Sequence, residues 1–124
     1  MSSPTRADKG HWAEELAQQY LIQQGLIPIT QNYRCKFGEI DLILWEKAIL
    51  VFVEVRYRQT QHYGGGIASI NKQKQQRIVT TASLYLQQQP FHPQPTCRFD
   101  AIILSGNINT TPDIQWLKDA FRVG

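Results

Sequence analysis

Two acidic residues stand within the most apolar stretches of the sequence, at a spacing that can make them neighbours. Asp41 lies in the segment GEIDLILW and Glu54 in the segment ILVFVEVRY. Successive side chains of a strand point to opposite faces of the sheet, so Glu54 and Arg56 are expected to share one face. If the two strands pair with their polar sides together, the carboxylates of Asp41 and Glu54 meet. Strict alternation divides the first segment into one face with Glu39, Asp41 and Ile43 and another with Ile40, Leu42 and Leu44.

Two neighbouring carboxylates repel each other, and a divalent cation between them removes that cost. Mg²⁺ or Mn²⁺ is the expected cofactor, because a hard ion prefers oxygen ligands and keeps water molecules that can attack a substrate. The expected ligands are the carboxylates of Asp41 and Glu54 and the backbone carbonyl of Val55. Such a site suits phosphodiester hydrolysis, in which a neighbouring cation also balances the charge of the transition state.

The same alternation has a simpler interpretation as a solvent-exposed strand. There, weak surface pairs of Glu54 with Arg56 or Arg58 would be worth about 0–1 kcal/mol each. Two observations count against this interpretation. The flanking runs LILW and LVFV are too apolar for an edge exposed to water, and the acids coincide with a basic middle third of the chain. A buried pair of carboxylates is better explained by a functional role.

The spacing of apolar residues predicts the elements that must position these groups. A helix is expected from an N-cap at Asp8 to Gly25, because apolar residues recur there at steps of three and four. A glycine-rich loop over 59–68 and a second helix opened by Ser69 are expected further along. The expected strands span 26–34, 38–45, 49–57, 98–104 and 113–117. The predicted order is therefore α-β-β-β-α-β-β, with the first three strands in an antiparallel meander.

Charge is unevenly distributed along a chain whose formal net charge is only +3. Residues 1–54 contain five Lys/Arg and seven Asp/Glu, whereas residues 55–99 contain six Lys/Arg and no Asp/Glu. The middle third should produce a positive field that attracts polyanions. A basic helix face that only maintains solubility is the alternative. Asp100, just beyond this region, is expected to pair with a basic side chain, either Arg98 or a lysine of the second helix.

Length and composition predict a single domain over residues 1–124, with residues 1–7 flexible. A content of 42% hydrophobic and 19% charged residues excludes a disordered or fibrous chain. No apolar run approaches the ~20 residues of a membrane span, and the N-terminus lacks the apolar stretch of a secretory signal. We therefore expect a cytoplasmic protein without a membrane partner. Cys35 and Cys97 fit no metal-ligand spacing and are expected to be free thiols.

Several segments also resemble a known family in order and spacing. They are AEELAQQYL (13–21), GEIDLI (38–43), FVEVRYR (52–58), the helix around Lys74 and RFDAI (98–102). Together they resemble the small bacterial family of uncharacterised proteins known as YraN or UPF0102, over nearly the whole chain. That family is similar to restriction-endonuclease-like nucleases of the PD-(D/E)xK superfamily and to archaeal Holliday junction resolvases. The resemblance implies an α/β fold with a mixed central sheet flanked by helices, and metal-dependent cleavage of DNA, with branched or junction DNA as one substrate.

The resemblance assigns roles to individual residues. Asp41 and Glu54 match the two motif acids, and Glu14 matches a glutamate of the first helix that reaches the metal directly or through water. Arg56 stands where the family pattern EVK has its lysine. Because arginine stays protonated, it cannot serve as a general base, although it can clamp a phosphate with two hydrogen bonds. We therefore expect slower cleavage than with lysine. The residues expected to contact the DNA backbone are Arg58, Lys72, Lys74 and Arg77.

Two other functions are consistent with the same residues. A non-catalytic DNA-binding module, which lost turnover when lysine became Arg56, would bind DNA without Asp41 or a metal. An interaction domain, whose basic helix meets an acidic partner, would have negligible affinity for DNA at moderate salt. Resolvase-like enzymes act as symmetric dimers, because a junction offers two equivalent strands, so a homodimer is an open alternative to a monomer.

Overall fold

The predicted order of elements is confirmed. The structure is a computed structural model and describes residues 6–58, 70–106 and 111–122. Its strands begin and end within two residues of the expected positions, except that the last strand continues four residues beyond its expected end. The elements are α1 (Arg6–Gln23), β1 (Ile27–Cys35), β2 (Gly38–Glu46), β3 (Ile49–Arg58), α3 (Lys72–Gln88), β4 (Thr96–Ser105) and β5 (Asp113–Phe121).

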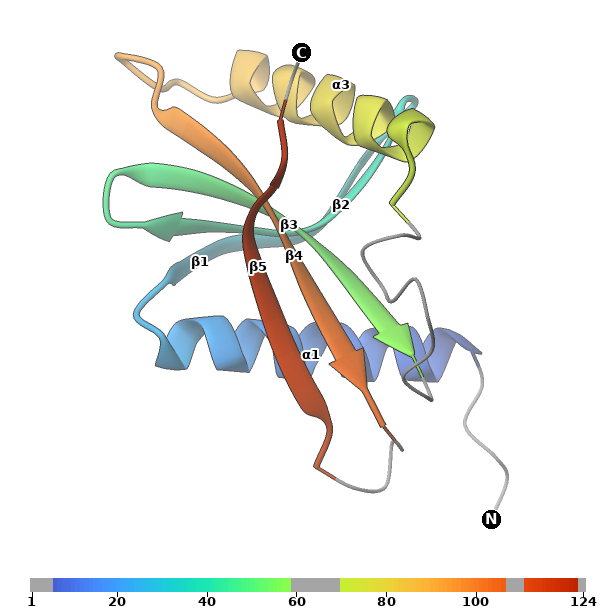
Figure 1. Cartoon of the computed structure of the whole chain (residues 1–124). Coiled ribbons are helices and arrows are strands. Elements are labelled where there is room, and N and C mark those ends of the chain that lie inside the picture. The colour runs from blue at the N-terminus through green and yellow to red at the C-terminus, as the bar shows by residue number, and fades with distance from the viewer. Residues whose placement is uncertain (1–5, 59–69, 107–110, 123–124) are drawn as a thin grey trace.

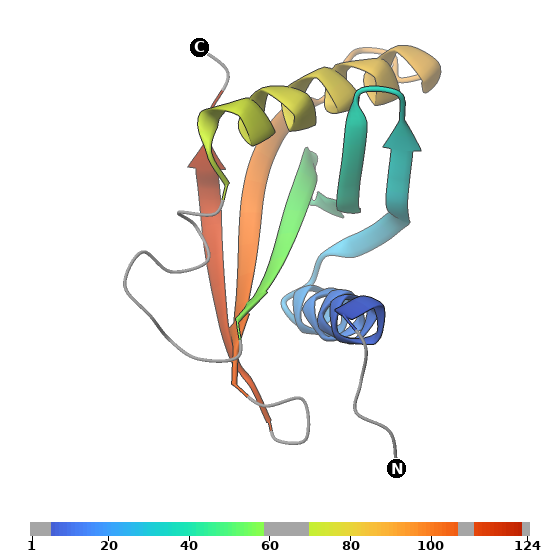
Figure 2. The same ribbon diagram turned by 90° about the vertical axis from the view of Figure 1, so that its right-hand side faces the viewer.

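The strands form one mixed sheet in the order β1-β2-β3-β4-β5. The first three strands are the predicted antiparallel meander. β4 pairs with β3 in parallel and with β5 antiparallel. A parallel neighbour requires a long crossover, and the connection that contains α3 provides it. The two helices lie on opposite sides of the sheet (Figures 1 and 2), so the fold is the α/β class that the sequence indicated.

Each side of the sheet has its own apolar core. Side chains of β3 alternate between the two, with Phe52 on the α3 side and Val53 on the α1 side. The buried residues on the α3 side are Ile40, Ile43, Leu50, Phe52, Ile70, Ile78, Ala82, Tyr85, Phe99, Ala101, Ile103 and Phe121. Those on the α1 side are Ala13, Ala17, Leu21, Leu26, Leu42, Leu44, Val51, Val53, Val55, Ile102 and Leu104. With both faces covered, the central strands are nearly continuous hydrophobic runs.

The first helix ends as predicted but begins earlier. Gly25 adopts a φ of 100°, and the Leu26 N–H donates to the carbonyl of Leu21 at 3.0 Å, which is a glycine-terminated helix end. The predicted N-cap at Asp8 is wrong, because α1 already begins at Arg6 and an N-cap must precede the helix. Residues 6 and 7, which the sequence predicted to be flexible together with residues 1–5, are the first two residues of α1. Residues 1–5 lie outside the described part of the chain.

The second helix begins later than predicted. Asn71, which has extended backbone, caps α3 by accepting a hydrogen bond from the Lys74 N–H at 2.9 Å. An opening at Ser69 is therefore too early, since Ile70 precedes the cap and is buried. An asparagine is among the best N-cap residues, which is the local signal that the apolar spacing concealed. The predicted loop over 59–68 lies outside the described residues.

Of the two partners that the sequence allowed for Asp100, the structure has Arg98 and not a lysine of the second helix. This fully buried carboxylate accepts hydrogen bonds from Arg98 Nε at 2.8 Å and Arg98 Nη2 at 2.9 Å. It also accepts from Trp116 Nε1 and from the Asp119 N–H, each at 2.9 Å. Because four donors surround it, the charge of Asp100 is compensated in place, and it joins β4 to β5.

Both cysteines, Cys35 and Cys97, are free thiols, as predicted. Neither helix in the described ranges combines the length and apolar character needed to cross a membrane.

Candidate active site

The site is built where β2 separates from β3. Backbone pairing of the two strands extends from Glu46 opposite Ile49 as far as Leu42 opposite Val53. Beyond that point β2 stays paired with β1 and diverges from β3 (Figure 2). The Asp41 carboxylate fills the fork, where its Oδ2 accepts a hydrogen bond from the Val55 N–H at 2.8 Å. A side chain thus replaces the backbone acceptor that continued pairing would have provided.

The fork also corrects the predicted faces of β2. Ile40 and Ile43 belong to the same core on the α3 side, while Leu42 belongs to the core on the α1 side. Strict alternation had placed Ile40 with Leu42 and opposite Ile43, which is wrong. Alternation assumes a strand that runs straight between two neighbouring strands. From Asp41 towards its beginning, β2 keeps β1 as its neighbour and is no longer paired with β3. The carboxylate of Asp41 consequently lies against the backbone of β3.

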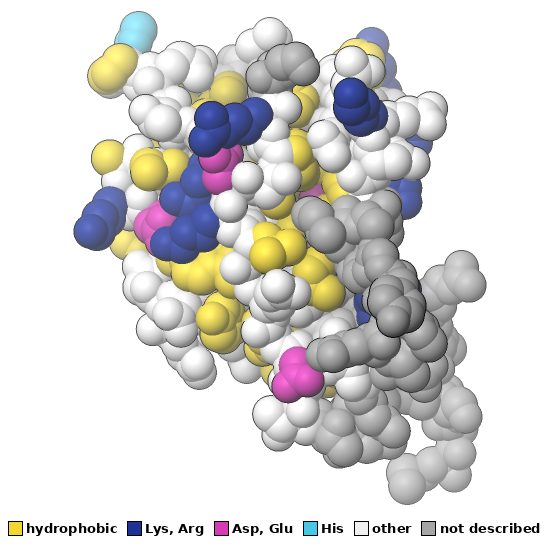
Figure 3. All heavy atoms as spheres, viewed as in Figure 1, with side chains coloured by type: hydrophobic (Ala, Val, Ile, Leu, Met, Phe, Trp, Pro, Cys, Tyr) yellow, Lys and Arg dark blue, Asp and Glu magenta, His cyan; other side chains and the backbone are white. Residues whose placement is uncertain are grey.

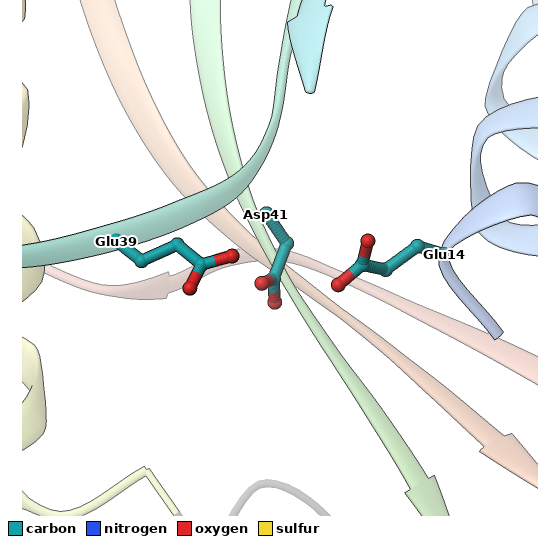
Figure 4. Close-up of side chains that lie close together, drawn as sticks. All are labelled: Glu14, Glu39 and Asp41. Atoms are coloured by element: carbon teal, nitrogen blue, oxygen red, sulfur yellow. The ribbon is translucent and has the colours of Figure 1, made fainter. Parts of the chain in front are cut away.

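Three carboxylates converge beside the fork. One oxygen each from Glu14, Glu39 and Asp41 lies within 4.8 Å of the others. Figure 4 shows Glu14 of α1 and Glu39 of β2 directed toward Asp41 from either side. The structure thus brings Glu14 to Asp41, and it adds Glu39, which sequence reasoning did not name as a ligand. Its position two residues before Asp41 in the same strand was the signal that could have identified it.

Glu54 is the most deeply buried carboxylate of the site, with 6% of its surface exposed. Burial, followed by the charge of Asp41, raises its pKa from 4.5 to about 8, although Arg56 opposes this shift. Burial also raises the pKa of Asp41 to about 6, against the hydrogen bond from the Val55 N–H. Glu54 Oε1 is buried and has no hydrogen-bond partner among the described residues. With both groups ionised, this acid pair would have more negative charge than its surroundings compensate, so without a bound cation it retains a proton.

Arg56 lies among the groups that the sequence assigned to a metal. Its Nη1 is 3.1 Å from Glu54 Oε2 and 4.0 Å from Asp41 Oδ2. The same Nη1 donates to the Val55 carbonyl at 3.2 Å, so this predicted third ligand already accepts a hydrogen bond. The guanidinium compensates one oxygen of Glu54 and leaves Oε1 without a partner among the described residues.

β1 supports the carboxylates that lie farther from Arg56. Burial has the largest effect on the pKa of Glu14 and raises it. The hydrogen bond from the Asn32 side chain lowers this pKa, and the charge of Glu39 raises it. Arg34 pairs with Glu39, with 3.4 Å between Nε and Oε2. The site thus draws on α1 and on three neighbouring strands.

The predicted DNA-contacting residues divide into two places. Lys72, Lys74 and Arg77 lie exposed on the first turns of α3. Lys and Arg side chains are visible at this end of the molecule in Figure 3. Arg58 ends β3, and that end of the strand lies beside α1, away from α3 (Figures 1 and 2). The structure therefore joins three of the four residues in one surface and separates the fourth.

Comparisons with known proteins find close relatives of unnamed activity. A family model described as "Uncharacterised protein family UPF0102" matches residues 13–104. A UPF0102 protein of Psychromonas ingrahamii is 51% identical over 92% of this chain and 89% of its own length. A UPF0102 protein of Pseudomonas putida strain GB-1 is 47% identical over 98% of this chain and 97% of its own length. A UPF0102 protein of Legionella pneumophila strain Philadelphia 1 is 45% identical over 94% of this chain and 97% of its own length.

Proposed function

The chain belongs to the uncharacterised protein family UPF0102, and from the chemistry of its site we propose that it is a metal-dependent DNA endonuclease of restriction-endonuclease-like fold. The observation that carries the proposal is the buried Oε1 of Glu54, which has no partner among the described residues and lies next to the raised-pKa carboxylate of Asp41. An uncompensated buried carboxylate is costly, and a bound cation removes that cost.

The donor set fits a hard divalent ion. Asp41, Glu14 and Glu39 offer carboxylate oxygens that lie within 4.8 Å of one another, and Glu54 lies beside Asp41 but outside that group. Carboxylate oxygens are the ligands that Mg²⁺ and Mn²⁺ prefer. An ion held by these residues supplies a water of lowered pKa and polarises a phosphoryl oxygen. The fork fixes Asp41 through the Val55 N–H, so this carboxylate needs no reorganisation before it binds a cation.

Arg56 has a different role from the lysine of the family pattern. Its guanidinium can hold the scissile phosphate through two hydrogen bonds and stabilise negative charge in the transition state. It cannot accept a proton from the attacking water. Among the residues of the site, that proton has to pass to a carboxylate, and slow turnover is the expected consequence.

DNA is the proposed substrate because its backbone matches the charge of the surface. Lys72, Lys74 and Arg77 on α3 would contact phosphates on one side of the fork and Arg58 on the other. Selectivity would follow the shape of branched or junction DNA, since backbone contacts read no base sequence. A homodimer acting on the two strands of a junction, and a location in the bacterial cytoplasm where DNA is found, are parts of the same proposal.

The test is cleavage of labelled duplex, flap, junction and single-stranded DNA in Mg²⁺, in Mn²⁺ and in EDTA. Cutting should require the metal, and Asp41→Asn should slow it by more than about 100-fold. Asparagine keeps an oxygen for the Val55 N–H, so the fork should survive in this variant. Glu15→Gln, which removes a carboxylate beside Glu14 on the same helix, is the matched control and should cut normally. Cutting that persists in EDTA or in Asp41→Asn would refute the proposal.

One observation favours a second candidate, a DNA-binding module without turnover. Arg56 already donates to the Val55 carbonyl and pairs with Glu54, so it can act as a permanent internal cation. This alternative expects equal DNA binding by the wild type and Asp41→Asn, in EDTA and in metal, with no cutting by either. Gain of cutting in Arg56→Lys would then identify the arginine as the reason for the lost turnover.

A further inference from the structure

The tip of the β1–β2 hairpin presents an aromatic side chain to the surface. Phe37 is 43% exposed, although large apolar side chains are usually covered. The ammonium of Lys36 lies 5.1 Å from the centroid of its ring. A cation over one aromatic face does not remove the apolar surface of the ring from solvent, so the ring of Phe37 remains available for contact with a ligand.

The backbone that carries this ring is held by the packing of the hairpin tip on α3. A Cβ atom added to Gly38 would lie 3.2 Å from Thr81 Oγ1, which shows how closely the backbone of the tip approaches the helix. Cys35 Sγ lies 3.6 Å from the same hydroxyl, and the Phe37 N–H donates to Cys35 Sγ at 3.4 Å. The backbone of Phe37 is therefore anchored to α3, which reduces the ordering cost of a contact made by its ring.

A hollow of about 340 Å³ lies between the tip and α3. Its lining combines cations, amides, a hydroxyl and one aromatic ring, without a carboxylate. The lining residues are Lys36, Phe37, Gln73, Gln76, Arg77 and Thr80. Aromatic rings stack on nucleobases, amides bond to base edges, and Lys and Arg bind phosphates. We call these six residues the hairpin–α3 surface.

We propose that the hairpin–α3 surface binds an unpaired nucleotide of DNA, with the base stacked on Phe37 and the adjacent phosphates on Lys36 and Arg77. The inference rests on DNA being the ligand of this protein, as the proposed function has it. Phe37 precedes Asp41 by four residues, which is about 13 Å along β2 at ~3.3 Å per residue, so a strand held here can continue to the fork.

This assignment selects a class of substrate. A base inside a duplex is stacked and paired, and it must leave the duplex before it can stack on a side chain. An unpaired base in a gap, flap or junction has no such cost. The hairpin–α3 surface should therefore favour DNA that combines duplex with unpaired nucleotides over continuous duplex.

The test is binding of fluorescently labelled DNA in EDTA, comparing a duplex with a five-nucleotide gap with the same duplex without a gap. Phe37→Ala should weaken binding to the gapped DNA about tenfold and leave binding to the continuous duplex unchanged. Phe37→Trp should keep the wild-type preference, because a larger aromatic ring still stacks. Ile27→Ala, which shortens another strongly exposed apolar side chain, is the matched control and should change neither affinity.

Arg77→Gln separates charge from stacking. Arg77→Gln should weaken the binding of both the gapped and the continuous DNA and should make the affinity less dependent on salt. Phe37→Ala should leave the salt dependence unchanged. A 2-aminopurine base in the gap should be quenched by the wild type and by Phe37→Trp, and not by Phe37→Ala. Thermal unfolding should give the same Tm for the wild type and Phe37→Ala, since the exposed ring contributes little to the core.

Three outcomes would overturn the inference. They are unchanged affinity of Phe37→Ala for gapped DNA, an equal loss on both DNAs, or conversion of a dimer to a monomer by Phe37→Ala with DNA binding intact, which would assign the surface to a second copy of the chain. Failure of the proposed function gives a different pattern. In that case the gap preference depends on Phe37 in EDTA, while no DNA is cut in Mg²⁺ or Mn²⁺.

Discussion

Replacing Glu54 with glutamine tests whether the acid pair retains a proton in the folded protein. Burial and the charge of Asp41 raise the pKa of Glu54 from 4.5 to about 8. A carboxyl group of raised pKa binds its proton more tightly in the folded than in the unfolded chain. Its contribution to stability is complete below about pH 4.5 and is lost as the pH rises through about 8. The metal-free wild type should therefore become less stable between pH 5 and pH 8.

The size of the effect follows from the same shift. One proton held by the folded state alone changes the free energy of unfolding by roughly 1.4 kcal/mol per pH unit. The raised pKa of Glu54 already includes the opposing effect of Arg56, and Asp41 and Glu54 share their protons, so about 2–3 kcal/mol is expected over this range. At about 3–5 °C per kcal/mol for a domain of this size, Tm should fall by roughly 10 °C.

The assay is thermal and urea unfolding in EDTA at pH 5, 6, 7 and 8. Glu54→Gln, which cannot ionise, should lose the fall in stability between pH 6 and pH 8 and keep only the smaller fall below about pH 6 that the raised pKa of Asp41 contributes. Glu46→Gln is the control. Burial acts to raise the pKa of Glu46, but hydrogen bonds from Arg98 and Lys118 outweigh it and lower the pKa. The stabilising effect of Glu46 is therefore present above about pH 4.5 and lost only below it, and this variant should show the wild-type slope from pH 5 to pH 8.

Metal provides a second arm of this experiment. Because a divalent ion competes with the proton for the same carboxylates, Mn²⁺ should stabilise the wild type more at pH 8 than at pH 5 and should not stabilise Glu54→Gln to the same degree. A wild type whose stability is flat or rises from pH 5 to pH 8 in EDTA would refute the reasoning. So would a Glu54→Gln variant that retains the wild-type slope.

Further outcomes are expected at three other positions. Glu39→Gln should weaken Mn²⁺ binding, measured by calorimetry, by about tenfold, and the control Glu15→Gln should not. If Glu39→Gln and the wild type bind Mn²⁺ equally, Glu39 is not a ligand. Asp100→Asn should lower the free energy of unfolding in urea by about 3 kcal/mol, because Arg98 loses its buried partner; a change near zero would contradict the account of that network. Arg56→Lys should cleave DNA at least as fast as the wild type in a single-turnover assay, and slower cleavage would mean that the planar guanidinium is required.

Local pattern was sufficient for the order of the elements and for several contacts. The spacing of apolar residues predicted both helices, because a 3.6-residue period is a property of a short segment. Gly25 indicated a helix end through its freedom to adopt positive φ. Arg98 was one of the two partners predicted for Asp100, because residues two apart in a strand share a face. The first residue of the second helix was predicted less accurately. Asn71 caps α3 through its own side chain, whereas the apolar spacing indicated a start at Ser69.

The candidate site was predicted in its residue types and only partly in its arrangement. Glu14 and Asp41, which are far apart in the sequence, lie together in the structure. The position of Arg56 against the Val55 carbonyl could not be inferred, because the path of a long side chain depends on every group packed around it. Alternation also misplaced Ile40, because it assumes that a strand keeps both of its neighbours along its whole length.

The sequence by itself determined the elements, the charge of α3 and the presence of acids within apolar strands, because each of these depends on residues near one another in the chain. Only the tertiary structure decided where β2 leaves β3, which places Asp41 against the Val55 N–H and brings Glu39 to Glu14. It also decided that the hairpin tip rests on α3 with Phe37 exposed. Strand separation and hairpin docking are settled by contacts between distant segments, and no short-range periodicity encodes them.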